Sequence, residues 1–327
     1  MQGGQPERTS PLASTPRALA FDACQWLQSR LPPPPAPEKP PLFILGLWRS
    51  GTTLAHGLVS ALPGFTAPLG WQCFRPASFR LAAPPRAGLA IARPMDDLSI
   101  TPLSPQEDEF ALLLMGLPSL YRGFLDPRRL ESLLPLLDGA DGSDWVVPFR
   151  AFTAAIAEQT PGRLVVKSPN HLFRLAAIRQ HFPQAPILLL LRDPATLYWS
   201  NLRMWRAMTG LYGHWPMPEG AIESFIASSM AAAARHFTTL AAMRRQGAPI
   251  ALCHFADLAA DPARAIADAL APLGYPLTAA DRQALAATAA AMRATPRTTP
   301  APLPPHAEAP AAALSDAIAA LYRATAA

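Results

Sequence analysis

The feature that most constrains the fold is a short apolar run, Leu42–Leu45, that passes directly into a turn containing glycine and serine. The turn continues from Gly46 through Gly51 to Thr52, where a stretch with helical character begins. A buried strand followed by such a turn and a helix aims several backbone N–H groups, together with the positive end of the helix dipole, at one spot. The segment therefore predicts a strand, an anion-binding loop and a helix in succession.

Three further apolar runs have the length and composition of buried strands. They cover residues 164–166, 187–191 and 250–253. Alanine-rich stretches with helical character lie between and after them, at residues 52–62, 171–181, 195–208, 221–245, 262–273 and 280–293. Strands that alternate with helices favour a parallel sheet covered on both faces. We therefore expect an α/β fold.

Proline marks the expected borders of this domain. The chain has 327 residues, of which 39 are proline, and a run at residues 32–41 predicts a stiff linker. We expect residues 1–40 to form an N-terminal arm with a helix at 17–31. Residues 41–295 would form one α/β domain. Residues 296–327 would form a proline-rich spacer followed by a helix at 311–324.

The net charge of +5 comes mainly from arginine, because only Lys39 and Lys167 are lysines among the 28 basic residues. The arginines are scattered, so an anionic small ligand is favoured over nucleic acid. Three widely spaced cysteines indicate neither a disulfide framework nor a metal site. The apolar runs are too short to span a membrane and no signal peptide is evident, so we expect a cytoplasmic protein.

The loop differs at one position from the phosphate loop of ATP- and GTP-hydrolysing proteins. Gly46 and Gly51 have the spacing of the pattern GxxxxGK[ST], but Thr52 stands where that pattern has its lysine. The missing lysine argues against a kinase or nucleotide hydrolase, which stays as an alternative on the same fold. A capped helix that binds no ligand is the plainer alternative.

The same loop resembles the 5′-phosphosulfate loop of sulfotransferases, which has the pattern [RK]-S-G-T-T. Those enzymes transfer a sulfuryl group from 3′-phosphoadenosine 5′-phosphosulfate (PAPS). The resemblance implies a P-loop NTPase-like three-layer sandwich, PAPS as co-substrate and no metal. It also implies that the loop holds the 5′-phosphate and the sulfuryl group. The residues that it assigns to donor binding are Arg49, Ser50, Gly51, Thr52, Thr53 and Leu54.

A second segment supports the resemblance. The apolar run at 187–191 ends in Arg192, and Asp193 and Pro194 have the sequence of a helix N-cap and first turn. Sulfotransferases have an arginine at a strand end and a serine eight residues later, which grip the 3′-phosphate of the nucleotide. The resemblance assigns this role to Arg192 and Ser200. Taken singly, the two are also explained as a strand-end charge and a hydroxyl bonded within its own helix.

Two more segments resemble the bacterial branch of the family. Residues 165–171 resemble its Lys-Ser-Pro segment, and residues 256–262 resemble an Ala-Asp-Leu-x-x-Asp-Pro element after a late strand. Lys167 is the one lysine in the body of an arginine-rich chain. Lysine presents a compact charge where arginine presents a planar fork. We therefore place Lys167 near the sulfuryl group, with a surface charge as the alternative.

The general base is the least determined residue of the site. The family's usual positions for it correspond here to Pro169 and Gln72, neither of which can act as a base. Glu107 has the place of the acid in an S-x-x-E capping box, which gives it a structural role. Glu109 lies next to a strongly apolar helix, so we name it the first candidate. Behind it come Glu107 and His171.

The functional hypothesis is a PAPS-dependent sulfotransferase that acts on a hydroxyl or amine acceptor by in-line displacement. Arg49 and Lys167 would stabilise the developing charge, and the base would take the acceptor proton. A protein that binds PAPS without catalysis is an alternative from another class. The acceptor stays open among small molecules, carbohydrates, lipids and peptides, and so does the oligomeric state. The aromatic residues that either line its pocket or belong to the core are Trp71, Phe74, Tyr121, Phe124 and Trp145.

Overall fold

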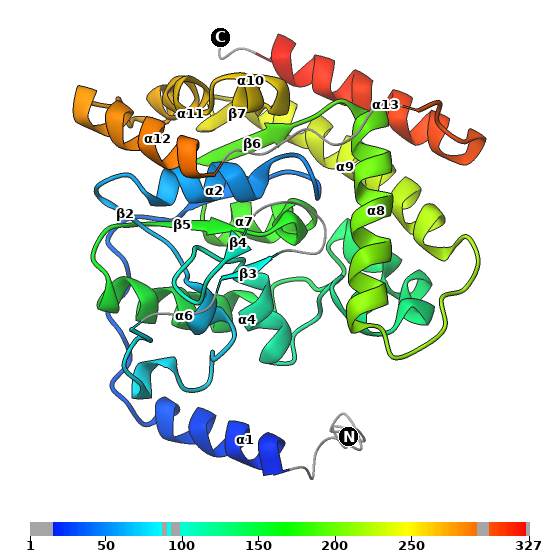
Figure 1. The fold of residues 1–327 in the computed structure, drawn as a ribbon. Helices are drawn as coiled ribbons and strands as arrows, with labels where there is room; N and C mark the ends of the chain where they lie inside the picture. Colours follow the sequence, from blue (N-terminus) through cyan, green and yellow to red (C-terminus); the bar gives the residue numbers. More distant parts are fainter. Residues whose placement is uncertain (1–15, 87–89, 93–98, 293–300, 325–327) are drawn as a thin grey trace.

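The computed structural model describes residues 16–86, 90–92, 99–292 and 301–324, with side-chain surroundings from residue 23 onward. Within these residues, a parallel sheet has the strand order β2-β5-β1-β6-β7 (Figure 1). Its strands are β1 (Leu42–Leu45), β2 (Phe65–Thr66), β5 (Arg163–Lys167), β6 (Ile187–Leu191) and β7 (Ile250–His254). The predicted α/β fold with a central parallel sheet is confirmed.

The strand β1 lies at the centre of this sheet, between β5 and β6. Ile44 pairs with Lys167 on one side and with Leu188 on the other. Because the strands are parallel, their carboxyl ends meet at the same edge of the sheet, where ligands of open α/β folds bind. The segments that follow these three strands therefore come together, although they are far apart in the sequence.

Helices cover both faces of the sheet, which explains why its strands are apolar throughout. Phe43 and Leu45 face one core, and Leu42 and Ile44 face the other. One core is closed by α2 (Thr52–Ser60), α11 (Pro262–Leu270) and α12 (Ala279–Ala291). The other is closed by α6 (Val146–Gln159), α7 (Leu175–His181), α8 (Pro194–Tyr212) and α9 (Ala221–Arg245). The result is a three-layer sandwich (Figure 1).

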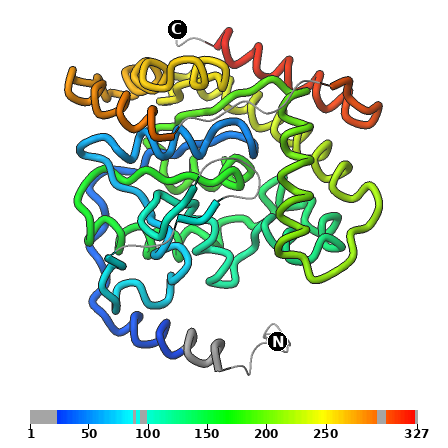
Figure 2. The backbone as a smooth tube through the Cα atoms, viewed as in Figure 1, coloured from blue at the N-terminus to red at the C-terminus, as the bar shows by residue number. Residues whose placement is uncertain are grey.

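The long connection between β2 and β5 consists of a series of short elements followed by the helix α6. Figure 2 shows it as the cyan and green part of the tube. Phe79 of this connection packs edge-on against Phe152 of α6, with ring centroids 5.5 Å apart. Its elements are α3 (Gly70–Cys73), η1 (Phe79–Leu81), β3 (Ile91–Ala92), β4 (Ser99–Ile100), α4 (Glu109–Leu114), α5 (Arg122–Leu125), η2 (Pro127–Arg129) and η3 (Glu131–Asp138), with η denoting a 3-10 helix. The remaining elements are α1 (Pro16–Ser29), η4 (Pro169–Arg174), α10 (Phe255–Ala260), η5 (Ala271–Leu273) and α13 (Pro305–Arg323).

The helix α13 closes the fold on the side of α8 and α9. Its Leu321 is fully buried in the core that these helices share. Arg244 of α9 donates to the carbonyl oxygens of Leu321 at 2.8 Å and of Ala324 at 2.6 Å. His306 Nε2 lies 3.0 Å from the Tyr198 hydroxyl of α8. Residues 305–324 are therefore packed on the domain.

Several local predictions need correction. The terminal helix begins at Pro305, not at residue 311, because Pro305 suits a first helical position and Pro310 is tolerated inside the helix. The capping box at Glu107 is wrong: α4 begins only at Glu109, and Ser104 Oγ instead accepts the Thr101 N–H at 2.9 Å. The predicted N-cap Asp193 is confirmed, since its Oδ1 accepts the Thr196 N–H at 2.7 Å.

The expected helix at 171–181 is two elements. Ser168 Oγ accepts the Asn170 N–H at 3.1 Å and Pro169 follows it, so the chain first forms η4 and only then α7. Residues 1–15 of the predicted arm and 296–300 of the predicted spacer lie outside the described residues. The domain borders at residues 40 and 295 stay a prediction. Among the helices that the structure describes, none is long and apolar enough to cross a membrane.

Candidate active site

The loop between β1 and α2 has the geometry of an anion-binding turn. Arg49 has φ 69° and Gly51 has φ 99°, in the left-handed region that turns successive N–H groups into a concave cradle. A Cβ atom on Gly51 would lie 2.7 Å from the Phe255 ring, so glycine alone fits there. Asn201 Nδ2 donates to Trp48 O at 2.8 Å and fixes the loop from α8. The N-terminus of α2 completes the cradle.

The two segments that the sequence singled out separately meet at this loop. Arg49 Nε donates to Ser200 Oγ at 3.2 Å. One terminal nitrogen of Arg192 donates to Arg49 O at 2.6 Å. The strand-end arginine, the helix serine and the loop arginine therefore form one cluster at the carboxyl edge of the sheet.

This cluster suits an anion. Burial and the positive charges of Arg49 and Arg203 lower the pKa of Arg192 to about 10. The Arg192 guanidinium also stacks on the Phe255 ring, 4.1 Å from its centroid. Arg192 Nε and the Ser50 hydroxyl, which is 1% exposed, have no hydrogen-bond partner in the described part of the chain. An anion with several oxygen atoms would satisfy these donors and offset the crowded positive charge.

Lys167 joins the loop to a carboxylate. Its ammonium lies 3.3 Å from Thr53 Oγ1 and 2.5 Å from Glu107 Oε1. The Tyr121 hydroxyl donates to the other oxygen of Glu107. Burial and the Glu107 charge hold the pKa of Tyr121 well above its usual range, so the phenol stays protonated as a donor. The sequence placed Lys167 near the loop, and the structure adds Glu107 and Tyr121 beside it.

Glu109 has different surroundings. Its two oxygens accept from the Arg174 guanidinium at 2.5 Å and 3.2 Å, and Glu109 is fully buried. Arg174 also donates to Asp141 at 2.6 Å. Burial alone would lower the pKa of Arg174, but these two carboxylates raise it. Glu109 and Glu107 are thus both in buried ion pairs, but the partner of Glu107, Lys167, also contacts Thr53 at the loop.

The two histidines near the site are buried. His171 Nε2 lies 2.6 Å from Asp108 Oδ2, and both side chains are inaccessible to solvent. Burial alone would raise the pKa of Asp108, but the charge and hydrogen bond of His171 lower it. His56 of α2 has its pKa lowered to about 3 by burial and by the charge of Lys167, so it is neutral. Neither histidine has a hydrogen bond to the loop among the described contacts.

The aromatic residues named from the sequence are mostly core. Trp71, Tyr121, Phe124 and Trp145 are at most 6% exposed. Phe74 is half exposed and packs against Phe110 of α4, with ring centroids 5.1 Å apart. Across the residues that the structure describes, no group of three or more His, Cys, Asp or Glu could hold a metal ion.

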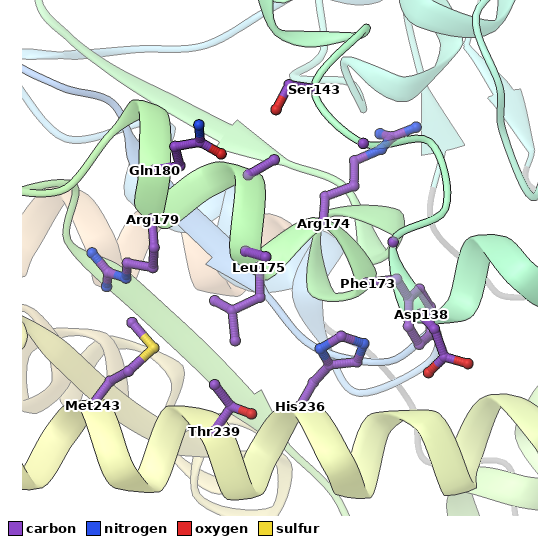
Figure 3. A pocket seen from close by; sticks show the side chains of 14 residues that line it. Asp138, Ser143, Phe173, Arg174, Leu175, Arg179, Gln180, His236, Thr239 and Met243 are labelled. Carbon is purple, nitrogen blue, oxygen red and sulfur yellow. The ribbon is translucent and has the colours of Figure 1, made fainter.

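A separate cavity of about 380 Å³ lies between α9 and the η4–α7 segment (Figure 3). His236, Thr239 and Met243 point into it from α9 toward Leu175. The Arg174 guanidinium lies at its border and points away from α9 (Figure 3). None of the loop residues lines this cavity, so it is distinct from the anion-binding cluster.

Sequence reasoning missed the residues that support the site from outside the motifs. Asn201, which holds the loop through Trp48 O, directly follows Ser200 in the sequence. This adjacency was the available signal that Asn201 also lies near the loop. The partners Asp108, Arg174 and Asp141 are charged residues that burial forces to pair. No local sequence pattern predicts which basic residue pairs with which acid, because these contacts join segments more than 30 residues apart.

Comparison with known proteins now identifies the class. The model of the Sulfotransferase family matches residues 40–279 of the chain. The chain therefore belongs to the sulfotransferase family.

Two curated relatives carry the name omega-hydroxy-beta-dihydromenaquinone-9 sulfotransferase Stf3, one from Mycobacterium bovis and one from Mycobacterium tuberculosis. Each is 31% identical to this chain over 183 residues, which is 53% of this chain and 47% of the relative. The matched part thus spans about half the length of these relatives.

Two solved structures share the fold. Sulfotransferase STF9 from Mycobacterium avium has a TM-score of 0.65 at 21% identity, covering 93% of this chain and 80% of that one. Sulfotransferase STF1 from Mycobacterium tuberculosis H37Rv has a TM-score of 0.58 at 20% identity, covering 85% and 81%. At these identities the likeness establishes the architecture alone.

Proposed function

We propose that this chain transfers a sulfuryl group from PAPS to an alcohol hydroxyl, with Glu107 as the general base. The observation that carries the proposal is the position of Lys167, which contacts both the loop, at Thr53, and the carboxylate of Glu107. Sulfuryl transfer needs charge stabilisation on one side of the reacting sulfur and a proton acceptor on the other. Lys167 contacts both groups that would meet these requirements, the loop and the Glu107 carboxylate.

The donor end of the site is supported by the loop and by its two arginines. The cradle of N–H groups with Arg49 suits the 5′-phosphosulfate end of PAPS. Arg192 and Ser200 would hold the 3′-phosphate, and the unsatisfied Arg192 Nε is a donor available for it. An arginine pairs with a phosphate in a planar, bidentate manner that lysine cannot reproduce.

The choice of Glu107 over Glu109 follows from their partners. Both oxygens of Glu109 accept from Arg174, and its release would break one of the two ion pairs of this buried arginine and leave only Asp141 as its carboxylate partner. Glu107 is held by an ammonium that also faces the loop. A sulfuryl group bound at the loop would compete for that ammonium, which would leave the Glu107 carboxylate room to accept a proton.

The proposed step is an in-line displacement at sulfur. The acceptor oxygen forms a bond to sulfur while the bond from sulfur to the bridging oxygen of the donor breaks. Glu107 takes the hydroxyl proton of the acceptor. The bonding electron pair leaves with the 5′-phosphate of the product, 3′-phosphoadenosine 5′-phosphate (PAP). Arg49, Lys167 and the loop N–H groups stabilise that charge.

For the acceptor we propose a hydroxylated isoprenoid. The names of the two curated relatives describe omega-hydroxy-beta-dihydromenaquinone-9 as their acceptor. Phe110 packs against the half-exposed Phe74 and against Tyr121, the hydrogen-bond partner of Glu107, so these rings offer apolar surface beside the proposed base. A lipid-like alcohol is accordingly the first acceptor to assay.

The test is calorimetric binding of PAP, with ADP and ATP–Mg²⁺ as comparators, followed by transfer from PAPS to an omega-hydroxylated prenyl quinone. We expect tight PAP binding, much weaker ADP binding and no dependence on Mg²⁺. A preference for ATP–Mg²⁺ would support a kinase or hydrolase instead. PAP binding without transfer to any alcohol in a broad panel would support a non-catalytic binding protein.

A further inference from the structure

Three consecutive acidic residues each pair with a different basic residue of one other segment. The acids lie directly before and at the start of α4, and the basic residues lie at the end of β5 and along η4. The contact distances are 2.5 Å, 2.6 Å and 2.5 Å in chain order. The pairs are Glu107–Lys167, Asp108–His171 and Glu109–Arg174, and we call them the acid ladder.

The three rungs of this ladder differ in what they touch. The first rung reaches the loop, because Lys167 contacts Thr53, and its acid Glu107 is 8% exposed. Asp108, His171 and Glu109 are each fully buried, and Arg174 is 3% exposed. The two inner rungs therefore have no direct access to a substrate at the loop. They can affect the reaction only through the position of the first rung.

Arg174 connects the two chain segments that surround the Glu107 carboxylate. It binds Glu109, two residues after Glu107. It also donates to Pro118 O at 2.9 Å, three residues before Tyr121, whose hydroxyl is the second partner of Glu107. One planar guanidinium thus fixes both chain segments that meet at the Glu107 carboxylate.

We propose that Arg174, together with the Asp108–His171 pair, acts as a positioning device for Glu107. This inference rests on the proposed function, in which Glu107 accepts the acceptor's proton. The register of the ladder sets where the Glu107 carboxylate lies relative to Lys167 and Tyr121. A shift of about 1 Å in a reacting group can cost about 100-fold in rate, so this register matters for transfer and not for donor binding.

The test is the variant R174K, made alone and in the E107Q background. A lysine keeps the charge but cannot reach Glu109, Asp141 and Pro118 O with one planar group. We expect R174K to lower kcat for transfer to an omega-hydroxylated prenyl quinone by about 30-fold, as expected for a misplaced reacting group. The affinity for PAP should change less than about twofold, because the donor site is untouched. In the E107Q background, R174K should lower kcat by less than about twofold, because the group that it positions is gone.

The matched control is R244K. Arg244 also donates to backbone carbonyls at buried chain segments, at the end of α13, far from the ladder in the fold. Its conversion to lysine should leave kcat and PAP affinity unchanged. If R174K does not fold, E109Q replaces it, because it keeps Arg174 bound to Asp141 while removing the charge of the third rung. We expect E109Q to show the same coupling to E107Q with a smaller loss of kcat.

Two results overturn the positioning role alone. One is an unchanged kcat in R174K or its substitute. The other is an equal loss of kcat with Glu107 and without it, which would show that Arg174 does not act through that carboxylate. A wild-type chain that binds no PAP and transfers no sulfuryl group would overturn the proposed function as well, and it would be recognised before any variant is made.

Discussion

The ammonium of Lys167 lies 2.5 Å from a carboxylate oxygen of Glu107. Lys167 is the only lysine in the sequence between residues 41 and 295. The pair is nearly inaccessible to solvent. It lies between the anion-binding loop and the start of α4, so it connects the loop with the acidic segment at residues 107–109.

The variant E107Q should lower kcat by about 100-fold or more, because an amide cannot accept the acceptor's proton and general-base catalysis contributes about this much. PAP affinity should stay within about threefold of wild type, since a threefold change is less than one charge-assisted hydrogen bond. Initial-rate assays and calorimetry measure the two quantities. The matched control is E131Q, at an exposed position of η3. A fully active E107Q would move the base elsewhere.

The variant R192A should weaken the binding of PAP by about 10- to 100-fold, as expected for the loss of a charged hydrogen bond of about 1.5–3 kcal/mol. Binding of 5′-AMP, which lacks the 3′-phosphate, should weaken far less. Calorimetry with both nucleotides makes the comparison. R245A removes the same formal charge from the exposed end of α9, before β7 and away from the loop. Equal losses for PAP and 5′-AMP in R192A would contradict the assignment of Arg192.

The variant G51A should destabilise the protein by about 1–3 kcal/mol, through strain at φ 99° and overlap with Phe255. It should also weaken PAP binding, because the loop N–H groups move. Urea unfolding and calorimetry report the two effects. Gly64, with φ 81° and open space around its Cβ position, gives the control G64A, which carries backbone strain without overlap. Equal behaviour of the two variants would rule out the contact with Phe255 as the cause.

The pH dependence of stability should reveal His56. Its folded pKa of about 3 lies below the unfolded value of about 6.5, so the unfolded chain binds one more proton between these values. Lowering the pH from 6.5 toward 3 should therefore cost about 1.4 kcal/mol of stability per pH unit from this group. H56Q should remove that part of the slope in urea titrations between pH 4.5 and 7.5, whereas H214Q at an exposed position should keep it. Identical slopes for H56Q and wild type would disprove the buried, neutral state.

The two segments that form the anion-binding cluster were predictable from sequence because each of them is local. Gly46 to Thr52 and Arg192 to Ser200 are continuous segments whose spacing follows from one turn and one helix. The parallel order of β5, β1 and β6 brings them together without further information. The roles that we assign to these residues still await the binding measurements above.

The acid side was not predictable in the same way. Glu107, Asp108 and Glu109 are adjacent, and the sequence ranked Glu109 first because of its apolar surroundings. Which acid meets Lys167 depends on the register between α4 and η4, and that register is fixed by Arg174 and its contacts with Asp141 and Pro118. These contacts are tertiary and leave no periodic trace in the sequence. The same reason explains why the capping box at Glu107 was wrong.

The packing of α13 has a consequence for how the protein is made. Synthesis proceeds from the N-terminus, so all strands and the helix that carries Ser200 leave the ribosome before Pro305. Tyr198 of that helix can contact His306 only after 108 further residues have been made. Arg244 of α9 can likewise donate to Leu321 O only after α13 has been made. The nascent chain therefore exposes apolar surface of α8 and α9 until α13 emerges. Translation pauses or chaperone contacts in this interval would act on the helix whose Ser200 contacts Arg49 of the loop.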